Sequence, residues 1–229
     1  MQIVLLPGLD GTGELFREFI NKLTSNYKVT IISYPTTLKG RYSDYVAYIK
    51  EYLPKDDFIV IAESFSGNIA HLLVQEEMGN LKAVIFVATF LQNPRVFLLN
   101  KYTLKLLKPL LNLPPNNTII KFFLVGSKAD TKLLKKVTET VKELPQTTIL
   151  HRLALISNLK YKSVNIDTKV VVLIAKDDKL IPQKCVKDFK KSYTNIKIFK
   201  IDGSHLLLQT NIPKTLNIIE SFIKEISCK

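Results

Sequence analysis

The sequence predicts an α/β protein: a doubly wound, mostly parallel sheet of about six strands with a helical cap inserted into it. Short apolar runs alternate with stretches in which apolar residues recur every three or four positions, and this alternation builds parallel sheets covered by helices on both faces. It is interrupted once, over residues 92–166, a span too long for a simple connection. The 229 residues suffice for one such domain with a substantial core.

The first part of the chain supplies four of the expected strands. We place them at residues 2–6, 27–34, 58–62 and 81–90. Helical stripes lie between them, at about 15–23, 45–53 and from 68 onward. The third strand has apolar or small residues throughout, as in strands that are buried on both faces.

Residues 92–166 are expected to form the cap within a single domain that spans 1–229. A leucine-rich stretch with interspersed lysines runs from 97 to 111, and Pro114-Pro115 ends it. An apolar run at 119–125 and helical patterns at 131–144 and 146–159 follow. Strands at 169–175 and 196–201 then complete the sheet, and the last helix opens at Pro213, a favoured first-turn position.

A turn at residues 62–67, Ala-Glu-Ser-Phe-Ser-Gly, joins the third expected strand to its helix. A serine flanked by small residues at such a junction is typical of a nucleophile elbow, where a larger Cβ would collide with the crossing strand and helix. Ser64 would then have a strained backbone and an exposed hydroxyl at the helix N-terminus. A plain helix N-cap fits the same six residues, so the turn alone leaves both interpretations open.

The loop after the first strand, residues 7–13, holds three of the eight glycines. Glycines concentrated there indicate a sharp turn or a close approach to a ligand. No Gly-Lys-Ser/Thr follows, and the spacing differs from the dinucleotide fingerprint G-x-G-x-x-G, so a phosphate-binding loop is disfavoured. The remaining interpretation is a loop that presents a backbone N–H to an oxyanion.

Chemically active side chains follow the last two strands as well. Asp177 and Asp178 follow the fifth strand, and His205 follows the sixth. Because open parallel sheets bind ligands at the carboxyl ends of their strands, these side chains are expected to meet Ser64 there.

Four segments in this order resemble the α/β-hydrolase family. The chain order Ser, Asp, His is the order found in that family. The segments are residues 6–13, 62–67, 175–182 and 203–205, and the resemblance covers nearly the whole chain.

The resemblance implies a role for each residue. Ser64 is the nucleophile, and His205 is first the base and then the acid. Asp178 orients the imidazole, with Asp177 left open as the alternative one residue away. The backbone N–H groups of Leu9 and Phe65 form the oxyanion hole. No cofactor and no metal are expected.

Ser66 is the rival nucleophile, disfavoured because Asn68 would then stand at a crowded small position. His71 is expected to be a packed or surface residue. His151 and Arg152 fall in the late cap, where nothing in the sequence supports a substrate contact.

The sequence also departs from the family pattern. The common fold has two further strands before the Gly-rich loop, so the first strand here corresponds to its third. Pro7 stands where a histidine is frequent, and Ala62, Ser66 and Ala175 stand where glycines are usual. Small residues are kept at each glycine position, so the geometry is expected to survive.

The net charge of +13 comes mainly from lysine, which accounts for 29 of the 33 basic residues, since only four are arginine. The lysines are scattered, and base recognition favours arginine, so we expect a solvated surface, no nucleic-acid partner and a weak attraction for anions. No uncharged apolar run approaches the roughly 18 residues of a membrane span. Cys185 and Cys228 fit no metal spacing and are expected to be free thiols in the cytoplasm.

The leading hypothesis is therefore a serine esterase or thioesterase with an apolar acyl pocket under the leucine-rich cap. The same triad would serve an acyltransferase or a peptidase. From a different class, a non-catalytic basic binding protein with this fold is the alternative. Its binding would weaken steeply with salt.

Overall fold

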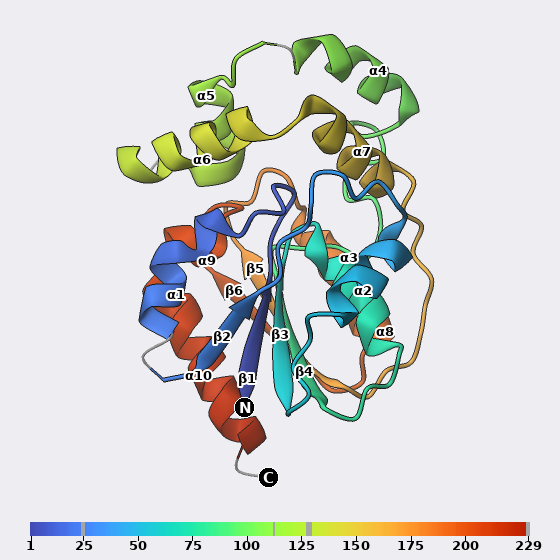
Figure 1. Cartoon of the computed structure of the whole chain (residues 1–229), viewed down its shortest axis with the longest axis vertical. Helices are drawn as coiled ribbons and strands as arrows, with labels where there is room; N and C mark the ends of the chain where they lie inside the picture. Colours follow the sequence, from blue (N-terminus) through green and yellow to red (C-terminus); the bar gives the residue numbers. More distant parts are fainter. Residues whose placement is uncertain (24–25, 112, 127–129, 228–229) are drawn as a thin grey trace.

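Six parallel strands form a single sheet in the order β2-β1-β3-β4-β5-β6. The structure, a computed structural model, describes residues 1–23, 26–111, 113–126 and 130–227. Figure 1 shows the strands running upward toward the cap, with the start of β1 and the end of α10 at the opposite end of the molecule. The strands are β1 (Gln2–Leu6), β2 (Lys28–Ile31), β3 (Phe58–Glu63), β4 (Leu81–Val87), β5 (Lys169–Ala175) and β6 (Ile196–Ile201).

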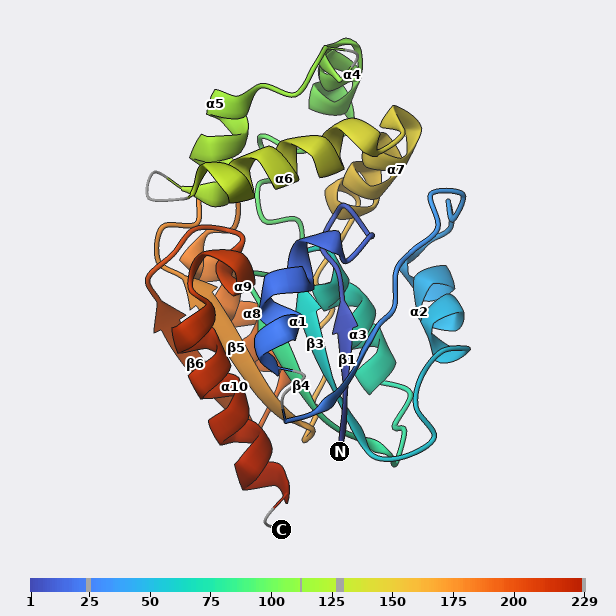
Figure 2. The same cartoon turned by 60° about the vertical axis from the view of Figure 1, so that its left-hand side comes forward.

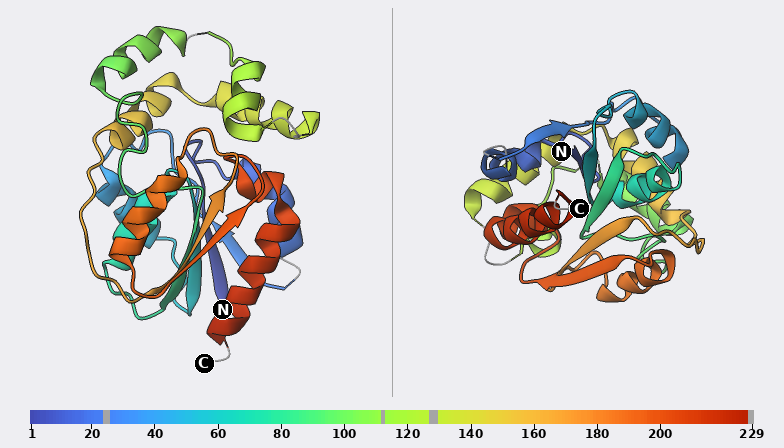
Figure 3. Two further views of the ribbon diagram at one scale, coloured as in Figure 1. Left: turned by 180° about the vertical axis from the view of Figure 1, so that it is seen from behind. Right: turned by 90° about the horizontal axis from the view of Figure 1, so that it is seen from below.

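Helices cover both faces of the sheet. One face carries α2 (Tyr42–Lys50), α3 (Ser66–Val74) and α8 (Val186–Ser192). The other carries α1 (Arg17–Leu23), α9 (Leu207–Thr210) and α10 (Ile212–Ser227), as Figure 3 also shows from below. Short 3-10 turns, η1 (Glu14–Phe16) and η3 (Gln183–Cys185), precede α1 and α8.

The core is divided by the sheet into two apolar clusters. Side chains alternate along each strand, so Val4 and Leu6 join the cluster under α2 and α3, whereas Ile3 and Leu5 join the one under α1 and α10. The central strand β3 is buried at every position, as expected for a parallel strand covered on both faces.

The cap lies over the carboxyl ends of the strands (Figures 1 and 2). It consists of α4 (Lys101–Leu110), α5 (Asn117–Ile120), the π-helix η2 (Lys121–Val125), α6 (Thr131–Glu143) and α7 (Gln146–Ser157). A third apolar cluster joins cap and base, in which Ile120, Val125 and Val137 contact Leu15 and Leu206. The apolar run at 119–125 is thus helical and partly buried.

The expected strands at 169–175 and 196–201 agree with β5 and β6, but two others are shorter than expected. The edge strand β2 ends at Ile31 and not at Tyr34, because the Tyr34 N–H turns to the Gly11 carbonyl at 2.7 Å. β4 ends at Val87, since Ala88 has a positive φ of 44° that breaks the extended backbone. In the described part of the chain, no helix has the length and apolar character needed to cross a membrane.

Candidate active site

Ser64 lies on a strained turn between β3 and α3. Its φ of 50° is in the left-handed region, which residues with a side chain rarely adopt. Its N–H donates to the Val87 carbonyl at 3.0 Å, and its carbonyl accepts from the Thr89 hydroxyl and from the Gly67 N–H. A Cβ at Gly67 would collide with the Thr89 side chain, so glycine is required there. These contacts hold the hydroxyl of Ser64 above the end of the sheet.

Ser64, His205 and Asp178 form a continuous hydrogen-bonded chain. The distance from Ser64 Oγ to His205 Nε2 is 2.9 Å, and that from His205 Nδ1 to Asp178 Oδ2 is 2.8 Å. Because a carboxylate only accepts, Nδ1 carries the proton, and Nε2 is left to accept the proton of the serine hydroxyl. The side chains of His205 and Asp178 are only 5% and 2% exposed. The arrangement fits base-assisted attack by Ser64.

The aspartate at this position is Asp178 and not Asp177. Besides His205, Asp178 accepts the backbone N–H groups of Leu180 and Ile181 at 2.8 Å each, through its other oxygen. Asp177 is exposed, and its own backbone N–H donates to the Gly203 carbonyl. The two backbone donors hold the Asp178 carboxylate against the imidazole.

The loop that carries Leu9 lies against Ser64. A Cβ placed on Gly8 would be 3.7 Å from Ser64 Cβ, which is van der Waals distance. Within the part of the chain that the structure describes, neither the Leu9 nor the Phe65 backbone N–H donates to a protein acceptor. Two unused donors beside Ser64 are what an oxyanion would need.

Ser66 is buried and bonded to other groups. Its hydroxyl donates to the Pro7 carbonyl and accepts from the Tyr34 hydroxyl at 2.6 Å. Burial of Tyr34 raises its pKa well above the ordinary value, so this phenol stays a donor. Ser66 therefore does more than fill the space of a glycine, because it ties the Gly-rich loop to the start of α3.

Arg152, on the cap helix α7, is fully buried and holds the same loop from above. Its Nη1 donates to the carbonyls of Leu9 and Asp10 at 2.8 and 2.7 Å. Longer bonds of 3.4 Å reach the Tyr34 carbonyl and the Tyr45 hydroxyl.

This anchoring role is not predictable from the sequence. The partners of the guanidinium are mostly backbone carbonyls more than a hundred residues away. One weak signal is the glycine at position 11. Its φ is 70°, and a Cβ added there would collide with the guanidinium. The scarcity of arginine in a lysine-rich chain is a second one.

The other two histidines have structural partners. His71 is buried, bonds to the Tyr193 hydroxyl at 2.7 Å, and has its pKa lowered to about 4 by burial. His151 Nε2 contacts the Gly40 carbonyl at 2.9 Å. In the residues described, no three His, Cys, Asp or Glu side chains gather in a way that could hold a metal ion. Cys185 is a buried free thiol, and Cys228 lies outside the described residues.

Glu63, the residue before Ser64, is a buried carboxyl that bonds to the Gln209 amide. Burial raises its pKa to about 8, with the Asp10 carboxylate adding to the rise and the nearby His205 and the Gln209 hydrogen bond opposing it. A group whose pKa rises from an ordinary 4.5 stabilises the fold below pH 4.5, and this contribution is lost as the pH rises toward 8.

We expect Glu63→Gln to be more stable than the wild type at alkaline pH. The amide does not ionise, so the difference in unfolding free energy should grow between pH 5 and pH 8, by up to roughly 5 kcal/mol. Urea unfolding at several pH values measures it. Glu143→Gln, at an exposed residue of the cap, is the control. A difference for Glu63→Gln that is constant with pH would contradict this account.

The pKa of His205 is raised above its ordinary 6.5. Burial alone would lower it, but the charge and hydrogen bond of Asp178, together with the charge of Glu63, outweigh burial. Neutral imidazole is the form that can accept a proton, so a reaction that uses His205 as its base is expected to slow as the pH falls through this pKa.

The acid limb of kcat/KM is therefore expected to have its midpoint above pH 6.5. In Asp178→Asn the rate should fall and the midpoint should move to lower pH, because the Asp178 charge that opposes the effect of burial is removed. A pH–rate profile with a soluble ester measures both. A wild-type midpoint at or below 6.5, or an unchanged midpoint in Asp178→Asn, would refute the assignment.

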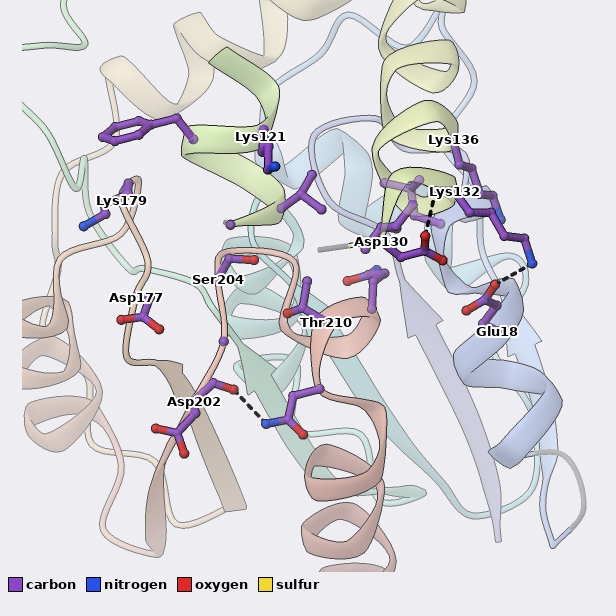
Figure 4. A pocket seen from close by; sticks show the side chains of 18 of the residues that line it. Glu18, Lys121, Asp130, Lys132, Lys136, Asp177, Lys179, Asp202, Ser204 and Thr210 are labelled. Carbon is purple, nitrogen blue, oxygen red and sulfur yellow. Dashed lines mark hydrogen bonds and ion pairs between the residues drawn. The ribbon is translucent and has the colours of Figure 1, made fainter. Parts of the chain in front are cut away.

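A cavity of about 900 Å³ lies between the cap and the base, beside the triad. Side chains from η2, α6 and the loops after β5 and β6 surround it, as Figure 4 shows. Its walls combine apolar residues such as Phe122, Val125 and Leu133 with charged ones such as Lys121 and Asp177. Ser204, next to His205, also lines it, whereas the three triad residues do not.

Solved structures of other proteins superpose on this chain over almost its whole length. A lipase-esterase related protein from Clostridium acetobutylicum superposes with a TM-score of 0.77 at 18% identity, covering 96% of this chain and 93% of that one. An esterase from Exiguobacterium antarcticum gives 0.77 at 13% identity, with 98% and 92% covered. MenH from S. aureus gives 0.72 at 15% identity, with 99% and 94% covered. No protein-family model and no curated protein matches the sequence.

The chain has the α/β-hydrolase fold. The parallel six-stranded sheet and these superpositions confirm the fold class expected from the sequence. Identities of 11–18% establish the fold alone, and the activity has to be argued from the site.

Proposed function

We propose that the protein is a serine hydrolase that cleaves a carboxylic ester or thioester through an acyl-enzyme intermediate. The hydrogen-bonded chain from Ser64 through His205 to Asp178, with Ser64 on a strained turn, is the observation that carries the proposal. A serine hydroxyl is a poor nucleophile until a base takes its proton, and His205 Nε2 is within reach to do so.

The reaction has two halves. Ser64 Oγ attacks the carbonyl carbon while its proton passes to His205 Nε2, and Asp178 stabilises the imidazolium. The N–H groups of Leu9 and Phe65 bind the oxyanion, each contributing roughly 3–4 kcal/mol at such sites. His205 then protonates the departing alcohol or thiol. Water, deprotonated by His205, attacks the acyl-Ser64 ester, which releases the acid and restores the hydroxyl.

We propose further that the acyl group is apolar and occupies the cavity under the cap. The apolar side chains of Phe122, Val125 and Leu133 on its wall support this. The leucine-rich stretch contributes less to the wall of the cavity than its composition predicts. Leu106 and Leu110 are 72% and 58% exposed and do not line the cavity. The pocket is thus assigned to η2 and α6.

The buried thiol of Cys185 supports a reducing, cytoplasmic location of the protein.

A series of nitrophenyl esters from acetate to dodecanoate tests this function. We expect a burst of about one nitrophenolate per enzyme, followed by slower turnover if deacylation limits the rate. kcat/KM should rise with chain length until the cavity is filled, because each buried methylene contributes about 0.8 kcal/mol. A flat profile would exclude the apolar acyl pocket, and the absence of hydrolysis of every ester and of the matching thioesters would exclude the function.

A further inference from the structure

Exposed apolar side chains are concentrated on the outer part of the cap. Among the residues that the structure describes, 14 large hydrophobic ones are exposed, and ten of these fall between residues 96 and 123. They are Val96, Phe97, Leu98, Tyr102, Leu106, Leu110, Leu113, Ile119, Phe122 and Phe123. Single exposed apolar residues are ordinary, but a concentration of them in one segment is typical of an interaction surface.

Helix α4 has three distinct faces. Leu104, Leu107 and Leu111, spaced three and four apart, are half-buried on the side that contacts α7. Tyr102, Leu106 and Leu110 form a second apolar stripe, which is exposed. Lys101, Lys105 and Lys108 form a third stripe, also exposed, beside the second. A helix that packed only onto the cap would need only the first of these faces.

The surface is positively charged without compensation. From residue 78 to residue 129 the sequence contains no Asp or Glu. The exposed lysines of α4 are Lys101, Lys105 and Lys108, and none of these three forms an ion pair in the described part of the chain. Elsewhere lysines do form such pairs, as Lys132 does with Glu18 at 3.2 Å.

This combination fits an anionic lipid surface. Lysines bind the headgroups of anionic lipids while the apolar side chains between them enter the acyl boundary. Nucleic acid would satisfy the lysines but leave Leu106 and Leu110 in water. A second copy of the chain would bring lysines against lysines.

We propose that the outer face of the cap, formed by α4 and the segment from α5 through η2, docks peripherally on an anionic lipid bilayer. Both parts lie at the end of the molecule opposite the end of α10 (Figures 1 and 2), so the base of the protein does not obstruct docking. Phe122 is 58% exposed and also lines the cavity. Docking therefore brings one wall of the cavity to the lipid surface. The proposal stands whether or not Ser64 is a nucleophile.

Sedimentation with vesicles tests the proposal, using the full-length Ser64→Ala protein so that no ester is consumed. We expect binding to vesicles of phosphatidylserine and phosphatidylcholine at 3:7, little binding to pure phosphatidylcholine, and release at high salt. Lys101→Gln/Lys105→Gln/Lys108→Gln should weaken binding about a hundredfold. The matched control on α8, Lys187→Gln/Lys190→Gln/Lys191→Gln, removes the same charge from three exposed positions on the base and should have a much smaller effect.

The apolar stripe is tested separately. Leu106→Ser/Leu110→Ser should weaken binding about tenfold or more with an unchanged melting temperature, since both side chains are already exposed. The chain contains no tryptophan, so a single introduced one reports its own surroundings. The fluorescence of Leu106→Trp should shift to the blue on anionic vesicles, and that of Phe199→Trp, on β6, should not.

Three results would overturn the proposal. One is equal loss of vesicle binding in the α4 and α8 lysine variants, which would mean attraction by net charge alone. Another is absence of binding to the anionic vesicles. The last is a dimer in sedimentation equilibrium that Leu106→Ser/Leu110→Ser abolishes, which would assign the surface to a second copy.

Discussion

Replacing Ser64 by alanine is expected to lower kcat/KM for a reactive ester by about 10⁴-fold or more. The alanine variant keeps the two unused backbone donors and the cavity but lacks the hydroxyl oxygen that lies 2.9 Å from His205 Nε2 in the wild type. Acyl-enzyme formation is then absent, and only the rate provided by binding and the oxyanion donors remains. Steady-state hydrolysis of nitrophenyl butyrate measures the loss, and circular dichroism checks the fold.

Ser66→Ala is the matched control. It removes an equivalent hydroxyl two residues away, which bonds to the Pro7 carbonyl and the Tyr34 hydroxyl. We expect a lower melting temperature, because two buried polar groups lose a partner, and activity within about tenfold of the wild type. If Ser66→Ala lost activity as completely as Ser64→Ala while remaining folded, Ser64 would not be distinguished as the nucleophile.

Arg152→Ala is expected to lower the free energy of unfolding by about 3–5 kcal/mol. The change leaves the part-buried carbonyls of Leu9 and Asp10 without their donor, and an unsatisfied buried group costs about 1–3 kcal/mol. It also removes a fully buried side chain from the contact between α7 and the Gly-rich loop. Urea unfolding measures the loss. His151→Ala, which removes one partly buried contact on the same helix, should cost about 1 kcal/mol.

The same substitution should act on the reaction through the position of the Leu9 N–H. In the folded variant we expect kcat to fall more than KM rises, since an oxyanion donor acts in the transition state. Arg152→Lys keeps the charge but loses the Nε and Nη2 donors to the Tyr45 hydroxyl and the Tyr34 carbonyl, so its loss should be intermediate. An unfolding free energy and a kcat for Arg152→Ala that match those of His151→Ala would rule out the anchoring role.

Two kinds of strand could be located from the sequence. The buried strand β5 follows from its apolar run, and the edge strand β6 from apolar residues that alternate with lysines. The end of β4 depends on the positive φ of Ala88, which no composition signals. The candidate site residues Ser64, Asp178 and His205 could be identified because each follows a strand, and parallel strands end at the same edge of the sheet. The choice between Asp177 and Asp178 could not be settled, since a shift of one residue changes the direction of the side chain.

Two residues of the site could not be found from local patterns. Arg152 binds backbone carbonyls, which every residue has, so its partners leave no pattern in the sequence. Glu63 resembles any polar residue at a strand end, and its raised pKa results from burial that only the packed loops around Gln209 and Asp10 produce. Both depend on tertiary contacts between distant segments.

Mapping the adduct of a fluorophosphonate probe by peptide mass spectrometry tests the central claim most directly. The phosphorus is attacked only by an activated nucleophile, so the account predicts one adduct per chain, on Ser64, and no adduct in Ser64→Ala or His205→Ala. An adduct on Ser66 or on another residue, or full labelling of Ser64→Ala, would contradict the triad of Ser64, His205 and Asp178.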